Sequence, residues 1–226
     1  TRMPSSLIAG EVRSLRQRGI TEETARHFGY KIGSYKDQAV HICPLHTADG
    51  KLVAQQLRTQ NKEFPIVGDF SSTPMFGTNL WAKGKKVVVT EGAIDAMSVS
   101  QVQDNKWPTI SLPNGAAGAA KAIKANMSYF KDFEEVVLMF DGDEAGEKAI
   151  AACAPLFPAG KCSIATINGF KDANEALLAG KHRQIMDAIW NAKKYRPDGI
   201  VSLKDLREEL DKPVEWGLPW FLETLN

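Results

Sequence analysis

The spacing of hydrophobic positions changes near residue 86. From there on, short apolar runs without alternation are separated by stretches with helical spacing. The apolar runs predict strands over 86–90, 109–112, 135–140 and 163–167. The stretches between and after them predict helices over 93–103, 145–156 and 172–179, and an Ala- and Lys-rich helix after residue 118. Regular alternation of strand and helix is typical of a parallel sheet covered by helices, so the expected fold class is α/β.

The first 85 residues follow a different pattern, with helical spacing first and strands afterwards. The predicted elements are a helix over 5–18, a second helix from the N-cap Thr21 to Gly29, and a hairpin of strands 39–43 and 52–58 around Asp49-Gly50. Residues 69–74 read as a loop. We therefore expect a smaller α+β subdomain at 1–85, followed by the parallel-sheet domain at 86–195.

The last residues lose both patterns. A short charged helix is predicted at 203–210, and Trp216, Trp220 and Phe221 follow with few apolar neighbours. Because an apolar tail usually needs a partner surface, residues 196–226 are interpreted as a linker towards a domain that is absent, and the chain as an excised fragment. No apolar run is long enough for a membrane span, no signal peptide is visible, and the three cysteines fit a reducing compartment.

Carboxylates stand at the ends of two predicted strands. Asp141 and Asp143 follow strand 135–140, and Glu91 follows strand 86–90. Strand ends of an open α/β sheet are where ligands gather, and like charges held together repel unless a cation lies between them. The three acids therefore predict a divalent-metal site. Asp95 is a weaker candidate, near Glu91 only if a helix begins at once.

The run Asp141-Gly142-Asp143 is compatible with more than one kind of site. An EF-hand would need oxygen ligands where this chain has Ala145 and Ala152, so that loop is excluded. Phosphatases of the haloacid-dehalogenase family resemble the motif locally, but Ala145 replaces their usual Thr or Val. Asp143 as a plain helix cap stays open, although it leaves Glu91 and Asp141 unexplained.

Further candidates have plainer alternatives beside them. Asp172 and Glu175 fit a capping box, which still allows Lys171 and Asp172 to face the site. The turn at Asn114-Gly115 either approaches a phosphate with its N–H groups or is only a tight turn. Arg58 and Lys62 lie at or just after the end of the hairpin. The spacing of His41, Cys43 and His46 suggests zinc, but a fourth ligand is missing and the first two fit strand positions, so a structural role is favoured.

Charge is uneven along the chain although the total is only +1. Residues 1–86 hold 13 Lys and Arg against 7 Asp and Glu, whereas the remainder holds 15 against 20. A basic first part beside an acidic second part suits a polyanion held next to a metal site, and an uneven solvated surface is the plain alternative.

Taken together, these motifs resemble a known family. Glu91-Gly92 and the run 140–146, each after an apolar strand, are similar to the TOPRIM domain of primases and of type IA and type II topoisomerases. With the runs 111–115 and 171–175, the chain resembles the primase half of T7-type primase–helicases, a DnaG-like primase. The resemblance covers nearly the whole chain, but the zinc-binding module and the hexameric helicase of that family have no counterpart motif here.

The resemblance implies a DNA primase that makes short RNA primers from NTPs on a single-stranded DNA template. Asp141 and Asp143 would hold Mg²⁺ (or Mn²⁺ in vitro), with Glu91 as a further ligand or as the base. Nucleotide or template contacts would come from Arg58, Lys62, Asn114 and Gly115, with Lys171 and Asp172 at the pocket edge. Implied partners are the helicase domain, the zinc module and a replicative DNA polymerase, in the cytoplasm of a phage-infected host or an organelle matrix. A TOPRIM nuclease and a catalytically silent replisome adaptor remain alternatives.

Overall fold

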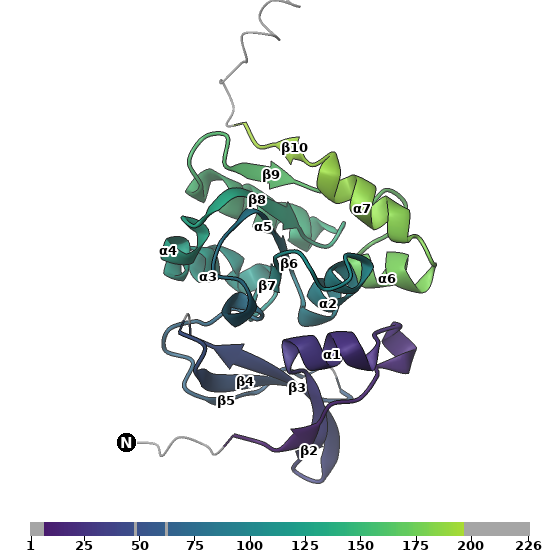
Figure 1. The fold of residues 1–226 in the computed structure, drawn as a ribbon. Coiled ribbons are helices and arrows are strands. Elements are labelled where there is room, and N and C mark those ends of the chain that lie inside the picture. The colour runs from purple at the N-terminus through teal and green to yellow at the C-terminus, as the bar shows by residue number, and fades with distance from the viewer. Residues whose placement is uncertain (1–6, 48, 62, 197–226) are drawn as a thin grey trace, which may run out of the picture. The chain divides into compact units, whose positions relative to one another are not determined.

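Two five-stranded sheets make up the protein, seen here as a computed structural model that describes residues 7–47, 49–61 and 63–196. Within each sheet, the strand order is β1-β2-β3-β4-β5 in the first and β10-β9-β8-β6-β7 in the second (Figure 1). The α/β class with an α+β first part is confirmed. The division of the chain at residues 85 and 195 stays a prediction, and the expected linker at 197–226 lies outside the described residues.

The first sheet is antiparallel throughout. Its strands are β1 (Gly10–Glu11), β2 (Lys31–Tyr35), β3 (Gln38–His46), β4 (Leu52–Arg58) and β5 (Ile66–Gly68). The predicted hairpin is confirmed as β3 and β4, but β5 was not expected. The second predicted helix is confirmed as α1 (Glu22–Phe28), where the Thr21 side chain accepts a hydrogen bond from the Thr24 N–H and Gly29 ends the helix at a φ of 66°.

The predicted helix over 5–18 is wrong for its described part. Residues 10–11 form the edge strand β1, and only Arg16–Arg18 make a short 3₁₀ turn, η1. The reason is tertiary: Gly10 pairs with Gly33 of β2, and a Cβ on Gly10 would lie 2.7 Å from the Ile32 carbonyl oxygen. The Gln55 side chain also bonds the N–H and the C=O of Ile8, which holds the backbone extended.

The second sheet contains the predicted parallel strands. They are β6 (Gly84–Thr90), β7 (Thr109–Ser111), β8 (Phe133–Met139) and β9 (Cys162–Ile164), with β10 (Lys193–Lys194) added antiparallel at one edge. The fourth strand is shorter than the predicted 163–167, because the chain leaves the sheet after Ala165 N–H bonds the Leu138 carbonyl.

Helices cover both faces of this sheet, as Figure 1 shows. One face packs against α2 (Ala93–Val102), α6 (Ala173–Leu178) and α7 (His182–Trp190). The other packs against α3 (Ala119–Ala125), α4 (Met127–Phe130) and α5 (Glu144–Cys153). The alternation of β6 explains the two cores, because Val88 faces the first group while Val87 and Val89 face the second.

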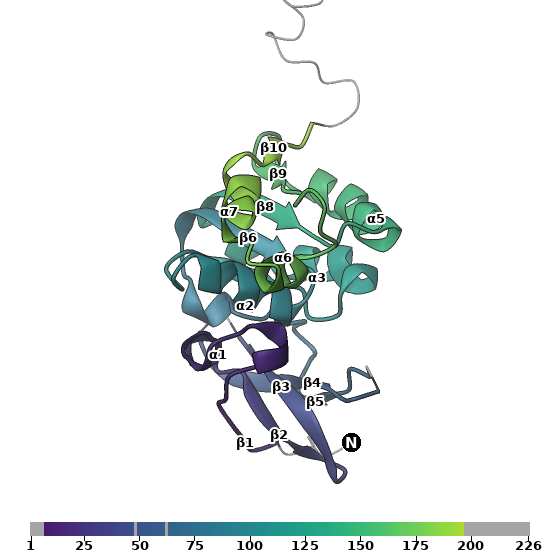
Figure 2. The ribbon, with the colours of Figure 1, turned by 90° about the vertical axis from the view of Figure 1, so that its right-hand side faces the viewer.

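The two sheets share part of one hydrophobic core. Phe28 and Leu45 from the first part belong to the same buried cluster as Met97 of α2. Both ribbon views place α1 between the first sheet and α2 (Figures 1 and 2). The segment before β6 is fastened as well, since Phe76 and Ser111 exchange two backbone hydrogen bonds of 3.1 Å. This packing fixes the first part beside the carboxyl ends of the parallel strands.

Two sequence features find their places in the first sheet. His41 and Cys43 are strand residues of β3, as predicted, and burial raises the pKa of the Cys43 thiol.

Among the described residues, no helix has the length and apolar character required to cross a membrane.

Candidate active site

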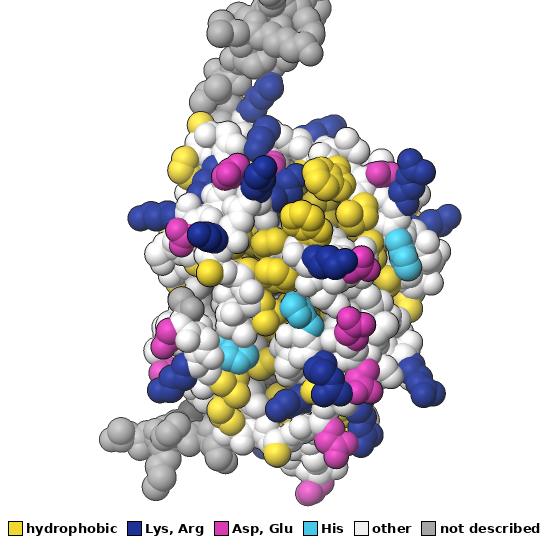
Figure 3. All heavy atoms as spheres, in the orientation of Figure 1, with side chains coloured by type: hydrophobic (Ala, Val, Ile, Leu, Met, Phe, Trp, Pro, Cys, Tyr) yellow, Lys and Arg dark blue, Asp and Glu magenta, His cyan; other side chains and the backbone are white. Residues whose placement is uncertain are grey.

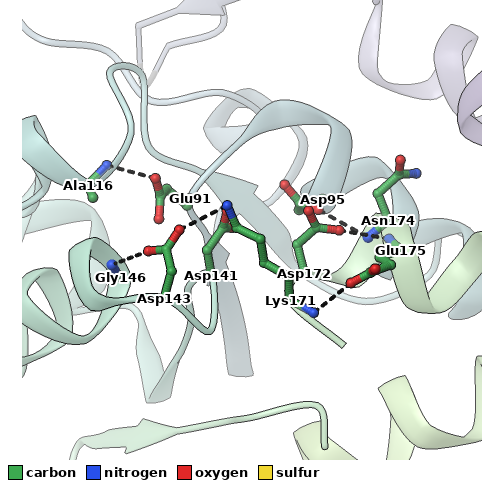
Figure 4. Close-up of polar contacts among 10 residues, drawn as sticks. All are labelled: Glu91, Asp95, Ala116, Asp141, Asp143, Gly146, Lys171, Asp172, Asn174 and Glu175. Atoms are coloured by element: carbon green, nitrogen blue, oxygen red, sulfur yellow. Dashed lines mark hydrogen bonds and ion pairs between the residues drawn. The ribbon is translucent and has the colours of Figure 1, made fainter. Parts of the chain in front are cut away.

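Three acids meet where β6 and β8 end. The two strands are parallel neighbours in which Thr90 pairs with Met139. Glu91 directly follows β6, and Asp141 comes two residues after the end of β8. The predicted convergence at one edge of the sheet is therefore what strand pairing produces, and Figure 4 shows the side chains of Glu91, Asp141 and Asp143 close together there.

The turn after β8 is shaped by a cap and a glycine. The Asp143 Oδ1 accepts a 3.0 Å hydrogen bond from the Gly146 N–H and so caps α5. A Cβ on Gly146 would lie 2.0 Å from the Asp141 carbonyl oxygen, so only glycine lets the backbone of Asp141 approach the first turn of the helix. The capping interpretation of Asp143 is thus correct, and its other carboxylate oxygen, Oδ2, pairs with Lys171.

A second loop is tied to this turn. The Gly142 N–H donates a 2.7 Å hydrogen bond to the Lys171 carbonyl. Asp172 caps α6 by accepting from the Glu175 N–H, and the Glu175 carboxylate accepts from the Lys171 N–H at 2.7 Å. The capping box is confirmed, and it presents the Lys171 and Asp172 side chains next to Asp141.

Lys171 lies between the two aspartates. Its Nζ is 2.9 Å from Asp143 Oδ2 and 3.7 Å from Asp141 Oδ2. The Gly146 N–H and then Lys171 hold the pKa of Asp143 below its usual range. For Asp141, burial and the neighbouring Glu91 and Asp172 prevail over Lys171 and raise the pKa to about 6. One lysine thus leaves the carboxylates undercompensated.

Asp95 also joins the group. Helix α2 begins at Ala93, directly after Gly92, so the helix start that Asp95 requires is present. Its Oδ1 accepts a 3.1 Å hydrogen bond from the Asn174 N–H, and burial followed by repulsion from Asp172 and Asp141 raises its pKa to about 7. Asp95 is therefore a further carboxylate of this cluster, and its charge interacts with those of Asp172 and Asp141.

Glu91 touches the predicted turn at Asn114-Gly115. Its Oε1 accepts a 3.2 Å hydrogen bond from the Ala116 N–H. Gly115 has a φ of 62°, and a Cβ there would lie 3.4 Å from the same oxygen. The buried Oε2 of Glu91 has no hydrogen-bond partner among the described residues. An unpaired buried carboxylate oxygen is costly unless a ligand meets it.

The donor set fits a hard divalent cation. Carboxylate oxygens are what Mg²⁺ and Mn²⁺ prefer, and the unpaired Glu91 Oε2 with the raised pKa of Asp141 marks negative charge in need of a partner. In the described part of the chain, no group of three or more His, Cys, Asp or Glu is already set as a ligand cage. Assignment of Glu91, Asp141 and Asp143 as metal ligands therefore stays a prediction.

A pocket of about 340 Å³ opens beside these acids. Its lining joins both parts of the chain: Glu91, Asp95, Asp141, Asn114 and Gly115 from the second, and Tyr30, Gln56, Arg58 and Phe64 from the first. The Gln56 amide donates to the Pro113 carbonyl and so fastens β4 to the turn. The predicted Arg58 thus lies in the same pocket as the acids, whereas the predicted Lys62 lies outside the described residues.

Phe64 and Arg58 form a flat wall of this pocket that the sequence pattern did not reveal. The Arg58 guanidinium carbon lies 5.7 Å from the centroid of the Phe64 ring, and the ring is 51% exposed. An exposed aromatic ring paired with an arginine is suited to stacking on a nucleobase. Phe64 begins the apolar run Phe64-Pro65-Ile66-Val67 that leads into β5, so the sequence alone does not distinguish it from residues that are buried.

A basic groove of about 720 Å³ continues from Arg58. Arg13, Arg16 and Arg18 line it together with Arg58, and none of its lining residues is acidic. A helix over 5–18 would place the first three arginines off its apolar stripe, so the sequence pattern does not predict their joint position beside Arg58. We call these four residues the arginine groove.

Comparisons with known proteins agree with this geometry. A Toprim-like family model matches residues 88–177, and the model of the bacteriophage T7 DNA helicase/primase N-terminal a+b fold matches residues 10–68. The crystal structure of the primase fragment of the bacteriophage T7 primase–helicase protein is 39% identical, with a TM-score of 0.78 over 84% of this chain and 82% of that chain. The chain belongs to the T7-type DNA primase–helicase family.

Two further relatives support this placement in the T7-type primase–helicase family. The DNA helicase/primase of Enterobacteria phage T3 is 39% identical over 205 residues, which are 91% of this chain and 36% of that protein. Primase domains of bacteriophage T7, in a complex with the lagging-strand DNA polymerase, an RNA/DNA hybrid and dTTP, are 40% identical with a TM-score of 0.80, over 85% of this chain and 100% of that chain. The chain thus spans about a third of the length of the T3 relative.

Proposed function

We propose that this chain is a DNA primase that makes short RNA primers from NTPs on single-stranded DNA, a nucleotidyltransferase of the DNA-directed RNA polymerase type. The observation that carries the proposal is the joint lining of one pocket by Glu91, Asp141 and Arg58. Acids for a metal, a cation for phosphates and an aromatic wall for a base then meet at one place. Family membership supports the same activity.

In the proposed reaction, the 3′-hydroxyl of one nucleotide attacks the α-phosphate of the next. A new O3′–P bond forms, the bond to the β-phosphate oxygen breaks, and pyrophosphate leaves. Mg²⁺ held by Asp141, Asp143 and Glu91 would stabilise charge on the attacking and leaving oxygens. Glu91 otherwise accepts the hydroxyl proton, for which its unpaired Oε2 is available.

The remaining residues bind and orient. Arg58, together with Lys62 outside the described residues, neutralises the triphosphate, and Asn114 and Gly115 line the same pocket. The Gly146 N–H and the ion pair with Lys171 lower the pKa of Asp143. The arginine groove holds template phosphates without reading bases, and Phe64 stacks on a base that enters the pocket.

Partners follow from the same proposal. The T7 primase domains that resemble this chain are described together with a DNA polymerase and an RNA/DNA hybrid. We propose a replicative DNA polymerase, a helicase domain and a zinc-binding module as partners here, with the cytoplasm of an infected host or an organelle matrix as the location. Zinc would belong to that module and not to the residues described above.

Replacement of Asp141 tests the chemistry. Asp141→Asn and Asp143→Asn should each lower Mg²⁺-dependent dinucleotide synthesis by at least about 100-fold, because each removes an anionic metal ligand. Both proteins should stay folded, since each change removes charge from a crowded cluster. Glu147→Gln is the matched control, an exposed acid of the same helix α5, and should keep wild-type synthesis.

The same assay separates the rival activities. Labelled NTPs and a single-stranded DNA are supplied together with Mg²⁺, and both products are followed. New oligoribonucleotides support priming, whereas shortened DNA means a nuclease. Full synthesis by both asparagine variants would refute the site, and neither product from the wild-type chain would favour a silent adaptor.

A further inference from the structure

A second basic and aromatic surface lies where the parallel strands begin, at the opposite end of these strands from the acids. It is a groove of about 930 Å³ lined by the start of β6, the segment before β7, the end of α7, and β10. Because β6 has seven residues at about 3.3 Å each, the start of β6 is about 20 Å from Glu91. We name it the lysine–tryptophan groove, after Lys83, Lys85, Lys86, Lys106, Lys194, Trp107 and Trp190.

Two large aromatic side chains are exposed in this groove. Trp107 is 58% and Trp190 is 69% exposed, the highest values among the large hydrophobic side chains of the described residues. Figure 3 shows hydrophobic side chains gathered over α7 with Lys and Arg beside them. Exposed tryptophans of this kind contribute little to the core, and together they mark a binding surface.

The charge of the groove is positive after its internal pairs are counted. Its lining holds five lysines and two glutamates. Glu135 is bound by Lys194 at 2.9 Å and by Lys86 at 3.4 Å, so these two lysines and one glutamate together leave one positive charge. Lys83 and Lys85 are exposed and, among the described residues, have no acidic partner. Free cations therefore stand beside the free rings.

One contact shows how cations and rings are combined. The Lys86 Nζ lies 5.5 Å from the centroid of the Trp190 ring and donates a 3.1 Å hydrogen bond to the Ile189 carbonyl. Glu135 and these contacts hold Lys86 in place, so one side of the Trp190 ring is supported while 69% of the residue stays exposed. A ring held in this way is pre-organised for stacking.

We propose that the lysine–tryptophan groove is a second binding site for single-stranded nucleic acid, separate from the arginine groove and the catalytic pocket. Bases stack on Trp107 and Trp190 while Lys83 and Lys85 neutralise the backbone phosphates, the combination used for binding without sequence preference. A single strand is required because a duplex keeps its bases stacked on one another. The site needs no metal and takes no part in nucleotide joining.

The test measures binding of fluorescein-labelled (dT)₁₂ by anisotropy, in a parent protein that carries Arg16→Gln and Arg58→Gln to weaken the arginine groove. Adding Trp107→Ala and Trp190→Ala should raise Kd at least about tenfold, because stacked bases lose their platforms. Adding Lys83→Gln and Lys85→Gln instead should reduce the slope of log Kd against log salt by about 1.4, for two lost phosphate contacts. Lys124→Gln with Lys148→Gln, on α3 and α5 over the other sheet face, is the charge-matched control.

Photocross-linking locates the strand directly. A (dT)₁₂ that carries 5-iodouracil should form adducts at Trp107 or Trp190 of the wild-type chain, mapped by mass spectrometry. Unchanged affinity of both groove variants, or adducts confined to other residues, would overturn the proposal. If the Trp107→Ala/Trp190→Ala variant lost self-association in sedimentation while its DNA binding stayed unchanged, the groove would be a protein contact. That result would also overturn the proposal. Dinucleotide synthesis by Trp107→Ala/Trp190→Ala in the wild-type background should stay unchanged, which separates this test from that of the proposed function.

Discussion

Gly146 shows how a single residue determines the position of the acids. The first turn of α5 lies so close to the preceding strand end that a Cβ at this position would be 2.0 Å from the Asp141 carbonyl oxygen. That oxygen belongs to the backbone, so the contact cannot be relieved by a side-chain rotation. The Asp-Gly-Asp turn and the glycine three residues after it are therefore one structural unit.

Replacement of Gly146 by Ala should separate the turn from the helix. We expect a loss of about 1–3 kcal/mol in the free energy of unfolding, typical of overpacking, and a fall in dinucleotide synthesis because Asp141 is displaced. Urea unfolding measures the first and a primer assay the second. Gly142→Ala is the control, since its Cβ would meet its nearest neighbour, the Lys171 carbonyl oxygen, at 3.5 Å. Equal stability of the two variants would show that the turn is not tightly packed.

At the scale of the element, local signals predicted most of what local chemistry decides. Short stretches of sequence were enough to predict the Thr21 cap, the helix end at Gly29, the hairpin of β3 and β4, and the strands of the parallel sheet. The helix over 5–18 is wrong in its described part because Gly10 and Glu11 pair with β2 as an edge strand. Nothing near Gly10 indicates that Gly33 will lie against it, since the two are 23 positions apart.

The site was likewise predictable only where it depends on the local pattern of strands. Parallel strands end at one edge, so the approach of Glu91 to Asp141 follows from the pattern alone. The insertion of Lys171 between the aspartates, the bond from the Ala116 N–H to Glu91, and the arginine groove all depend on how loops from distant elements fold back. Such contacts have no local signature, and the roles of the acids as metal ligands stay predictions.

Asn174 connects three elements at the back of the site. Its buried side chain donates to the carbonyl of Arg18, the last residue of η1, at 2.7 Å and to the Ser98 hydroxyl of α2 at 3.0 Å, while its own N–H in α6 donates to Asp95. Asn174→Ala should lower the free energy of unfolding by about 1–3 kcal/mol, because the part-buried carbonyl of Arg18 and the buried hydroxyl of Ser98 lose their donor. Asn191→Ala, which removes an exposed bond at the end of α7, should cost clearly less. Thermal unfolding of both variants checks this, and equal losses would remove the linking role.

At the scale of the whole molecule, charge is divided between two surfaces. The acids lie at the carboxyl ends of β6 and β8, and the arginine groove extends from the same pocket through Arg58. A polyanion is repelled by the acids and attracted by the arginines, so in the proposed reaction its backbone would stay in the groove while only the reacting phosphates approach the predicted metal ligands. Under the proposed function, this arrangement would let a chain of net charge +1 bind a nucleic acid.

The salt dependence of template binding tests that division. Arg16→Gln with Arg58→Gln should weaken binding of single-stranded DNA to the otherwise unchanged chain and lower the slope of log Kd against log salt by about 1.4, since each arginine releases counterions from one phosphate. Arg26→Gln with Arg183→Gln removes the same charge from exposed ion pairs with Glu22 and Asp187 and should leave the slope near its original value. Titrations between about 50 and 200 mM salt, the range over which phosphate contacts show their effect, measure both. A slope that falls equally in the two variants would mean that net charge alone attracts the strand. The proposal that the arginine groove positions the template beside the acids would then be wrong.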